Sequence, residues 1–284
     1  MALSKQRHIS PCGCGKGKAC WLVPLGTRFP GMGDFLSVGI QGFAPRWALR
    51  ETFGTREDAA RERKRREQIV ETWASAEGTA SRVETAHTIV YSQALKHPRL
   101  QWAIRELEVW KGQPRARLSF RFNRTSSDAP ESYYVVFPLA AEGALPRLSN
   151  GGQPFVPFQD QLPGTCRDYF AIDGWAHYST SDGNWLWVSR DAPMIGLGTH
   201  SALARRKNAP QDTHRLLAMI FNNFWYTNFV GNSHGRMEFQ FDLAWSAALE
   251  DPAGVAEALV NQPVAAINPS RREHPILMER LFRP

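Results

Sequence analysis

The stretch FNNFWYTNFVGNSHGRMEFQFDLAW, residues 221–245, decides the fold class of this chain. Its second half alternates in polarity, because Met237, Phe239 and Phe241 are apolar and the residues between them are polar. A period of two is typical of a β-strand with one buried face. The segment 231–235 contains two glycines and predicts a turn. We therefore expect the two halves of the stretch to pair as a hairpin.

The first half of this stretch mixes aromatic side chains with amides. Asn222, Asn223 and Asn228 stand among Phe, Trp and Tyr residues. A buried amide needs hydrogen-bond partners, so the mixture predicts either a fully hydrogen-bonded corner of the core or a polar site with aromatic walls. The rest of the chain has to supply the partners in either case.

The totals describe an ordinary globular chain. Its 284 residues suffice for one large domain or two small ones. Hydrophobic residues make up 43% and charged residues 21%, which is typical of a folded chain. No run approaches the roughly 18 apolar residues of a membrane span, and no secretory signal is recognisable at the N-terminus. We expect a cytoplasmic protein with reduced cysteines and no membrane partner.

The net charge of +7 raises the question of a nucleic-acid partner. The densest charged block, residues 56–67, contains six cations and four anions. Mixed signs of this kind are typical of a solvated helix face, and the other arginines are scattered along the chain. We therefore expect no binding to nucleic acid.

The first 83 residues differ in character from the rest. Residues 1–50 are rich in Gly and Pro and predict an irregular tail with one short strand over 35–40. Residues 55–58 have the form of a helix capping box, and apolar residues follow at helical spacing. We expect an amphipathic helix over 56–77, within a helical linker over 51–83. Such a helix either binds a partner or docks on its own chain, and we favour docking.

From residue 84 onward the pattern is that of strands separated by turns. We expect strands at residues 88–95, 102–110, 115–123, 133–139, 175–180, 185–190 and 194–197. A short helix near 247–260, interrupted at Pro252, is the exception. Many strands at short intervals predict a mostly β fold, a large antiparallel β-sandwich over residues 84–284.

The sequence contains no recognisable metal-binding or nucleophile motif. Cys12, Cys14 and Cys20 do not have the spacing of zinc-ligand pairs, and their glycine-rich surroundings favour a disordered tail over a site completed by His8. No two histidines have metal-ligand spacing, and no G-x-S-x-G string occurs. We assign no metal site and no catalytic residue.

Among the carboxylates, Asp168 and Asp191 stand out, because each follows an arginine in an irregular stretch. Two carboxylates about 5–10 Å apart would suit glycoside hydrolysis. We favour structural arginine–aspartate pairs that hold loops. The aromatic residues within 169–187 and 224–229 fit either a carbohydrate site or the hydrophobic core. Sugar rings stack on aromatic faces, but aromatic residues at strand spacing are more often part of the core.

Three segments, in this order along the chain, resemble a known family. They are DAPMIGLG at 191–198, IFNNFWYTNF at 220–229 and MEFQFDL at 237–243. Together they resemble the C-terminal β-rich region of the family 38 glycoside hydrolases, the α-mannosidase family. The resemblance covers residues 84–284.

Members of that family cleave α-mannosides with a carboxylate nucleophile and a zinc ion, both belonging to an N-terminal barrel domain. This chain shows no matching barrel or ligand set. The resemblance therefore implies no catalytic residue, metal or cofactor in this chain, with zinc belonging to the missing catalytic domain. It also implies two kinds of partner: an α-mannoside-like glycan, and a catalytic barrel domain or chain.

Two functions follow from the resemblance. In the first, the chain is the β-domain of an α-mannosidase-like enzyme and supports or lines the substrate groove of a catalytic domain not present here. Its candidate groove residues are Arg167, Asp168, Trp225 and Asn228. In the second, it is a free-standing carbohydrate-binding or structural module without hydrolase activity. In both, we expect the chain alone not to be catalytically competent.

Overall fold

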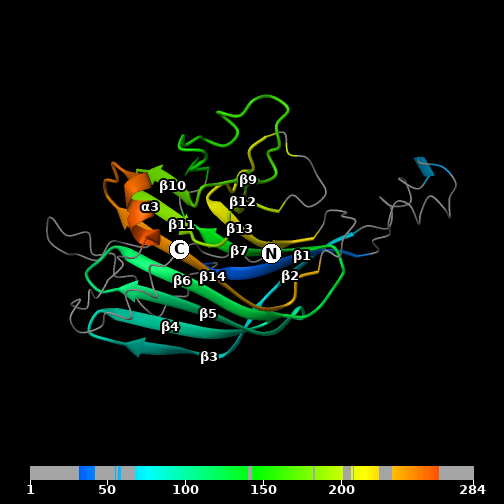
Figure 1. Ribbon diagram of the computed structural model, residues 1–284, viewed down its shortest axis with the longest axis horizontal. Coiled ribbons are helices and arrows are strands. Elements are labelled where there is room, and N and C mark those ends of the chain that lie inside the picture. The colour runs from blue at the N-terminus through cyan, green and yellow to red at the C-terminus, as the bar shows by residue number, and fades with distance from the viewer. Residues whose placement is uncertain are drawn as a thin grey trace, which may run out of the picture.

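The protein folds into two antiparallel sheets packed face to face (Figure 1). The structure is a computed structural model, and it describes residues 32–41, 55, 57–58, 68–139, 143–181, 183–200, 206, 208–223 and 232–261. The predicted mostly β fold, an antiparallel sandwich, is confirmed.

One sheet has six strands in the order β2-β1-β7-β13-β12-β9. Its strands are β1 (Asp34–Gln41), β2 (Gln68–Trp73), β7 (Glu131–Pro138), β9 (Phe170–Ala171), β12 (Met194–Leu197) and β13 (Arg215–Asn222). β7 and β13 lie at its centre and are buried along most of their length, because both faces of this sheet are covered.

The other sheet has eight strands in the order β3-β4-β5-β6-β14-β11-β10-β8. Its strands are β3 (Ser75–Glu84), β4 (Thr88–Lys96), β5 (Leu100–Trp110), β6 (Arg115–Arg124), β8 (Arg147–Leu148), β10 (Trp175–Thr180), β11 (Gly183–Ser189) and β14 (Gly235–Ser246). Side chains alternate between buried and half-buried along β6, as its sequence predicts.

Aromatic side chains fill the space between the sheets. Phe35 of β1 stacks on Phe120 of β6, with ring centroids 5.3 Å apart. Phe137 of β7 meets Phe241 of β14 edge-on at 5.0 Å and Trp187 of β11 at 5.6 Å. All five rings are fully buried. The interpretation of the aromatic residues within 169–187 as core is confirmed for Trp187. Such ring pairs add stability beyond the area they bury.

One helix, α3 (Pro252–Val260), packs on the outer face of the eight-stranded sheet (Figure 1). Asp251 is its N-cap and accepts a hydrogen bond from the amide of Gly254. Pro252 thus begins the helix instead of interrupting it, because the first helical position needs no amide hydrogen. Among the described residues, no helix has the length and apolar character that crossing a bilayer requires.

The predicted hairpin over residues 221–245 is wrong. β13 pairs with β7 and β12 in the six-stranded sheet, whereas β14 pairs with β6 and β11 in the other. The segment therefore passes from one sheet to the other. Turn residues predict a reversal of the chain but do not decide which sheet takes the returning strand. Residues 224–231 lie outside the described residues.

The predicted helix over 56–77 is wrong in its second part, because β2 and the start of β3 occupy residues 68–77. β2 pairs with the free edge of β1, and its residues are of types that favour strands. The predicted cap does form, since the Asp58 amide donates to Thr55 Oγ1 at 3.0 Å and residues 57–58 are helical. Residues 59–67 are outside the described part. The strand predicted over 35–40 is confirmed as β1, so the sandwich includes strands that precede residue 84.

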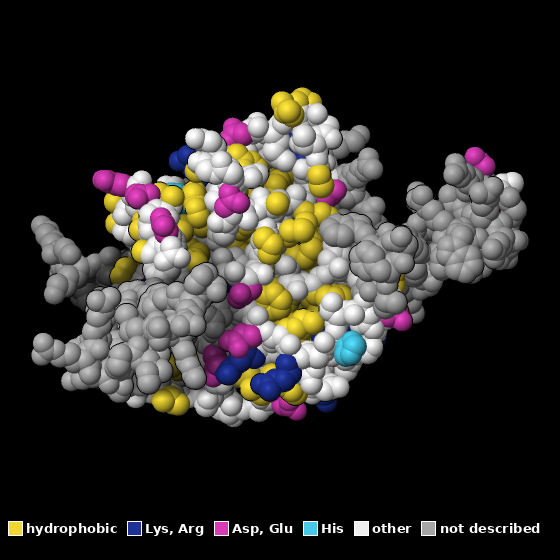
Figure 2. Space-filling model, in the orientation of Figure 1, with side chains coloured by type: hydrophobic (Ala, Val, Ile, Leu, Met, Phe, Trp, Pro, Cys, Tyr) yellow, Lys and Arg dark blue, Asp and Glu magenta, His cyan; other side chains and the backbone are white. Residues whose placement is uncertain are grey.

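The eight-stranded sheet ends in a charged edge. Every residue of β3 is exposed, and Glu84 pairs with both Arg82 and Lys111. Figure 2 shows side chains of both signs side by side over this part of the molecule. Charged side chains on an exposed edge strand oppose pairing with another chain.

Candidate functional site

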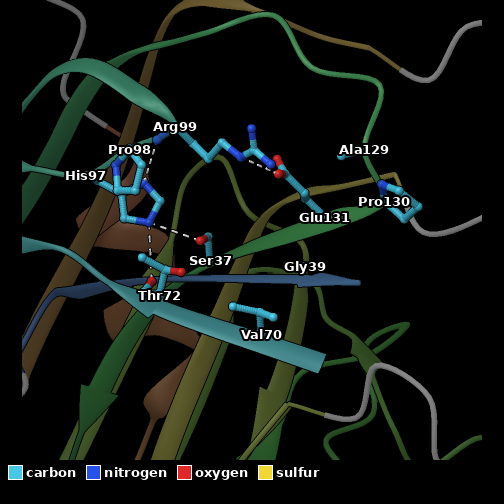
Figure 3. A pocket seen from close by; sticks show the side chains of 10 residues that line it. All are labelled: Ser37, Gly39, Val70, Thr72, His97, Pro98, Arg99, Ala129, Pro130 and Glu131. Atoms are coloured by element: carbon cyan, nitrogen blue, oxygen red, sulfur yellow. Dashed lines mark hydrogen bonds and ion pairs between the residues drawn. The ribbon is translucent and has the colours of Figure 1, made fainter. Parts of the chain in front are cut away.

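A cavity of about 330 Å³ opens between the two sheets where the β4–β5 turn approaches β1 and β2 (Figure 3). The inner faces of β1 and β2 and two loop segments line it: Ser37, Gly39, Val70, Thr72, His97, Pro98, Arg99, Ala129, Pro130 and Glu131. This volume is at the lower end of the range of about 300–1,000 Å³ found for small-ligand sites.

His97 is the most constrained side chain of the cavity. Its Nδ1 accepts a hydrogen bond from the Arg99 amide at 3.1 Å, and its Nε2 lies 3.0 Å from Ser37 Oγ and 3.3 Å from the Thr72 carbonyl oxygen. Only 3% of the residue is exposed. Burial lowers the pKa of His97 to about 4; the Thr72 carbonyl opposes this shift and the Arg99 charge adds to it. His97 is therefore neutral near pH 7.

The hydrogen bonds also assign the tautomer of His97. Because Nδ1 accepts from a backbone amide, the ring proton is on Nε2, which donates to Ser37 Oγ and the Thr72 carbonyl. A general base that activates a serine must instead accept the hydroxyl proton. Ser37 and His97 therefore do not form a nucleophile–base pair, and the Ser37 hydroxyl hydrogen stays available to another acceptor.

Glu131 is the one carboxylate of the cavity, and its side chain is 3% exposed. Arg99 Nε lies 2.5 Å from Oε1, while Oε2 accepts from Tyr133 Oη at 2.8 Å and lies 3.5 Å from Arg124 Nη2. Burial, followed by the charge of Glu131, raises the pKa of Tyr133. Each carboxylate oxygen thus has donors from the protein, which keeps the buried charge compensated.

Arg124 pairs with Glu131 from the buried side, away from the cavity. Its guanidinium is fully buried, lies 4.0 Å from the Phe221 ring centroid, and donates to Asn232 Oδ1 at 3.1 Å. It also donates to the carbonyl oxygens of Ser127 and Ser233. A buried guanidinium with several acceptors and an aromatic face is fully compensated.

An amide of the 221–245 stretch is part of this support. Asn223 Oδ1 accepts from the Glu131 amide at 2.5 Å, and its Nδ2 donates to the Ala129 carbonyl at 2.9 Å. The expectation that amides here are hydrogen-bonded is confirmed for Asn223. Asn223 thereby fixes the segment that leads into β7 and holds Glu131 at the cavity.

Of the four candidate groove residues, Arg167 and Asp168 are described, and neither lines this cavity. Asp168 lies two residues before β9, the edge strand of the six-stranded sheet, and its Oδ1 accepts from the Arg206 amide at 2.9 Å. Arg167 stands next to it in the chain. Trp225 and Asn228 lie outside the described residues. The grouping of these four residues therefore stays a prediction.

The sequence did not indicate the residues that do meet. Ser37 and His97 are 60 positions apart, and only the pairing of β1 with β2 and the β4–β5 turn joins them. The signal that was present is the short His-Pro-Arg segment between two predicted strands, which holds a titratable group and a cation in three residues.

A second buried carboxylate lies on the outer face of the eight-stranded sheet. Asp242 of β14 is fully buried, with Arg117 Nε and Arg190 Nε each 3.0 Å from its oxygens and Arg115 Nη2 at 3.3 Å. Arg190 also donates to the carbonyl oxygens of Leu259 and Val260 at the end of α3. The cluster joins β6, β14, the end of β11 and α3.

Asp242 lies on the polar face of β14, and this face is exposed at Glu238 but covered at Asp242. Asp191 accepts from the Gln240 amide at 2.9 Å, while its neighbour Arg190 pairs with Asp242. The favoured Arg190–Asp191 pair is therefore wrong in its partner: Arg190 pairs with Asp242, and Asp191 binds a backbone amide.

No group of three or more His, Cys, Asp or Glu residues in the described part of the chain could hold a metal ion. Cys12, Cys14, Cys20 and His8 lie outside that part. Cys166 is exposed and has a free thiol.

Comparison with known proteins gives a likeness in structure alone. No family model matches the sequence, and no curated protein does. An α-mannosidase from Enterococcus faecalis V583 superposes with a TM-score of 0.53 at 10% identity, over 81% of this chain and 28% of that one. A glycosyl hydrolase family 38 protein from Enterococcus faecalis gives 0.51 at 8% identity over the same shares. This chain thus spans 28% of their length and shares the fold of that portion.

Proposed function

We propose that the chain is a carbohydrate-related β-domain that supports or lines the substrate groove of an α-mannosidase-like catalytic domain outside these residues. The observation that carries the proposal is the superposition of 81% of this chain on 28% of an α-mannosidase. Most of that enzyme has no counterpart here, so a catalytic part would have to come from another domain or chain.

The chemistry of the described residues supports a non-catalytic role. Retaining glycosidases need one carboxylate free to attack and a second that exchanges a proton. Glu131 and Asp242 are both buried and bound by arginines. His97 is neutral and has its ring nitrogens engaged.

The groove residues Arg167, Asp168, Trp225 and Asn228 remain part of the proposal. Asp168 lies in a long irregular segment beyond β8, and such segments often carry binding residues. The second candidate function is a free-standing module that binds a carbohydrate. The cavity beside Glu131 favours it, because a binding module needs a site of its own.

One experiment tests the proposal. The purified chain is assayed for hydrolysis of an aryl α-mannoside with and without added zinc, alone and after co-expression with the products of the neighbouring reading frames. We expect no turnover by the chain alone, and co-purification with a barrel-containing partner that is active. Zinc-dependent turnover by the chain alone would contradict the proposal.

A further inference from the structure

We infer that the cavity between β1, β2 and the β4–β5 turn binds a sugar acid, a pyranose that carries a carboxylate. The choice of a sugar rests on the proposed function. The choice of an anion rests on the side chains of the cavity.

The first argument is the kind of hydrogen-bonding group left over. Ser37 accepts from His97, so its own hydroxyl hydrogen has no acceptor among the described residues. The Thr72 hydroxyl likewise has no protein partner in that part of the chain. Figure 3 shows one terminal nitrogen of Arg99 directed away from Glu131. Each of the three unused groups can donate, and the Thr72 hydroxyl can also accept. A ligand that offers several oxygen acceptors and hydroxyls matches them.

The second argument is charge. Glu131 is shared by two guanidiniums, Arg99 and Arg124, so these three side chains together carry one positive charge in excess. His97 adds no charge near pH 7, because burial lowers its pKa. A guanidinium nitrogen that Glu131 does not use can donate a charge-assisted hydrogen bond to a second carboxylate. The bound anion would balance the excess charge.

The third argument is size and wall chemistry. The cavity of about 330 Å³ suits a single sugar ring better than an oligosaccharide. Val70, Pro98 and Pro130 give apolar wall beside the donors. A pyranose has C–H faces between its hydroxyls and meets both kinds of wall, whereas a small ion would leave the apolar part uncovered.

Calorimetric titration of the full chain with D-glucuronate, D-glucose and acetate tests the inference. We expect glucuronate to bind, and glucose and acetate each to bind at least about tenfold more weakly. The loss with glucose would report the missing carboxylate, and the loss with acetate the missing ring. No binding of glucuronate at millimolar concentration, or equal binding of either control, would overturn the inference.

Gly39 offers a variant that blocks the cavity and leaves its ligands in place. A Cβ atom at Gly39 would lie 3.9 Å from its nearest neighbours, Glu131 Cγ and the Pro130 oxygen, so the strand accommodates a side chain there. Gly39→Val should abolish glucuronate binding while melting temperature and near-UV circular dichroism stay close to wild type. Undiminished binding by this variant would place the ligand elsewhere and overturn the inference.

Gly196→Ala is the matched control. It lies in the same sheet but outside the cavity, and its added methyl would also make only ordinary contacts, the nearest at 3.8 Å. Its glucuronate affinity should equal that of wild type. Failure of the glucuronate test is distinguishable from failure of the proposed function, which would appear as mannoside hydrolysis by the chain alone.

Discussion

Glu131 and Asp242 are both buried carboxylates held by arginines, yet they lie in different settings. All three arginines of Asp242 are largely covered, with 15–26% of their side chains exposed, and one also binds the end of α3. At Glu131, Arg124 is fully buried but Arg99 is 44% exposed and borders a cavity. The difference teaches that a buried carboxylate alone does not mark a site. A ligand site is marked when an arginine bound to the carboxylate also has an unused donor beside a cavity.

The largest effect is expected at Asp242. Asp242→Ala leaves three arginines without their shared carboxylate and should lower the free energy of unfolding by about 3–5 kcal/mol. Denaturant titration measures it. The control Asp191→Ala removes an exposed carboxylate that accepts a single amide hydrogen, and should cost about 1 kcal/mol. Equal losses in the two variants would contradict the conclusion that Asp242 stabilises the fold by binding three arginines.

Lowering the pH should destabilise the folded state through His97, which lines the cavity together with Glu131. The charged groups bonded to Asp242 in the described part of the chain are arginines. The pKa of His97 is about 4 in the folded chain, against about 6.5 when unfolded. The unfolded state therefore binds more protons between these values, and stability falls as the pH drops from 6.5 to 4. The loss attributable to His97 approaches about 3 kcal/mol at pH 4 and vanishes above pH 6.5.

Unfolding free energies of wild type and His97→Gln across this pH range measure the effect. Other carboxylates also titrate there, so the difference between the two curves is the quantity of interest. Wild type should lose its advantage over the variant as the pH falls. Parallel curves would mean that His97 is not held neutral by the fold.

Glu131→Gln is expected to cost less than Asp242→Ala, about 1–3 kcal/mol. Arg124 keeps three oxygen acceptors, on Ser127, Asn232 and Ser233, as well as its contact with Phe221. The glutamine also retains an oxygen for Tyr133. Thermal or denaturant unfolding checks the order of the two variants, and a reversed order would contradict the contrast between them.

Arg99→Gln should have the smallest effect on stability, below about 1 kcal/mol, because the side chain is half exposed and solvent screens its pair with Glu131. Denaturant unfolding measures it against Arg117→Gln. Arg117 is 15% exposed and binds Asp242 through two nitrogens, so its loss should cost about 1–3 kcal/mol. A larger loss for Arg99→Gln than for Arg117→Gln would show that Arg99 is structural.

Much of the sandwich was predictable, because alternation along β6 and β14 records which face meets the core. The sheet that β14 joins was not predictable, because no local feature of residues 221–245 distinguishes a hairpin from a connection between the two sheets. The second part of the helix expected over 56–77, residues 68–77, was wrong for a related reason. Apolar residues at helical spacing occur there by coincidence, and pairing with β1 overrides the local preference.

The site was less predictable than the fold. Ser37, Thr72, His97 and Glu131 come from four separate segments, and only the topology assembles them. The role expected of Asp168 rests on its place after an arginine in an irregular stretch, and it stays a prediction. The core role expected of the aromatic residues is confirmed at Trp187, and the buried face expected from alternation is confirmed at Phe241.

The most direct test of the contrast measures binding and stability on the same two variants. Glucuronate affinity by calorimetry and melting temperature are recorded for Arg99→Gln and Arg117→Gln. We predict that Arg99→Gln loses binding by at least about tenfold with little change in melting temperature, while Arg117→Gln melts earlier and binds as wild type does. The opposite assignment, with binding lost in Arg117→Gln and kept in Arg99→Gln, would contradict a ligand site beside Glu131.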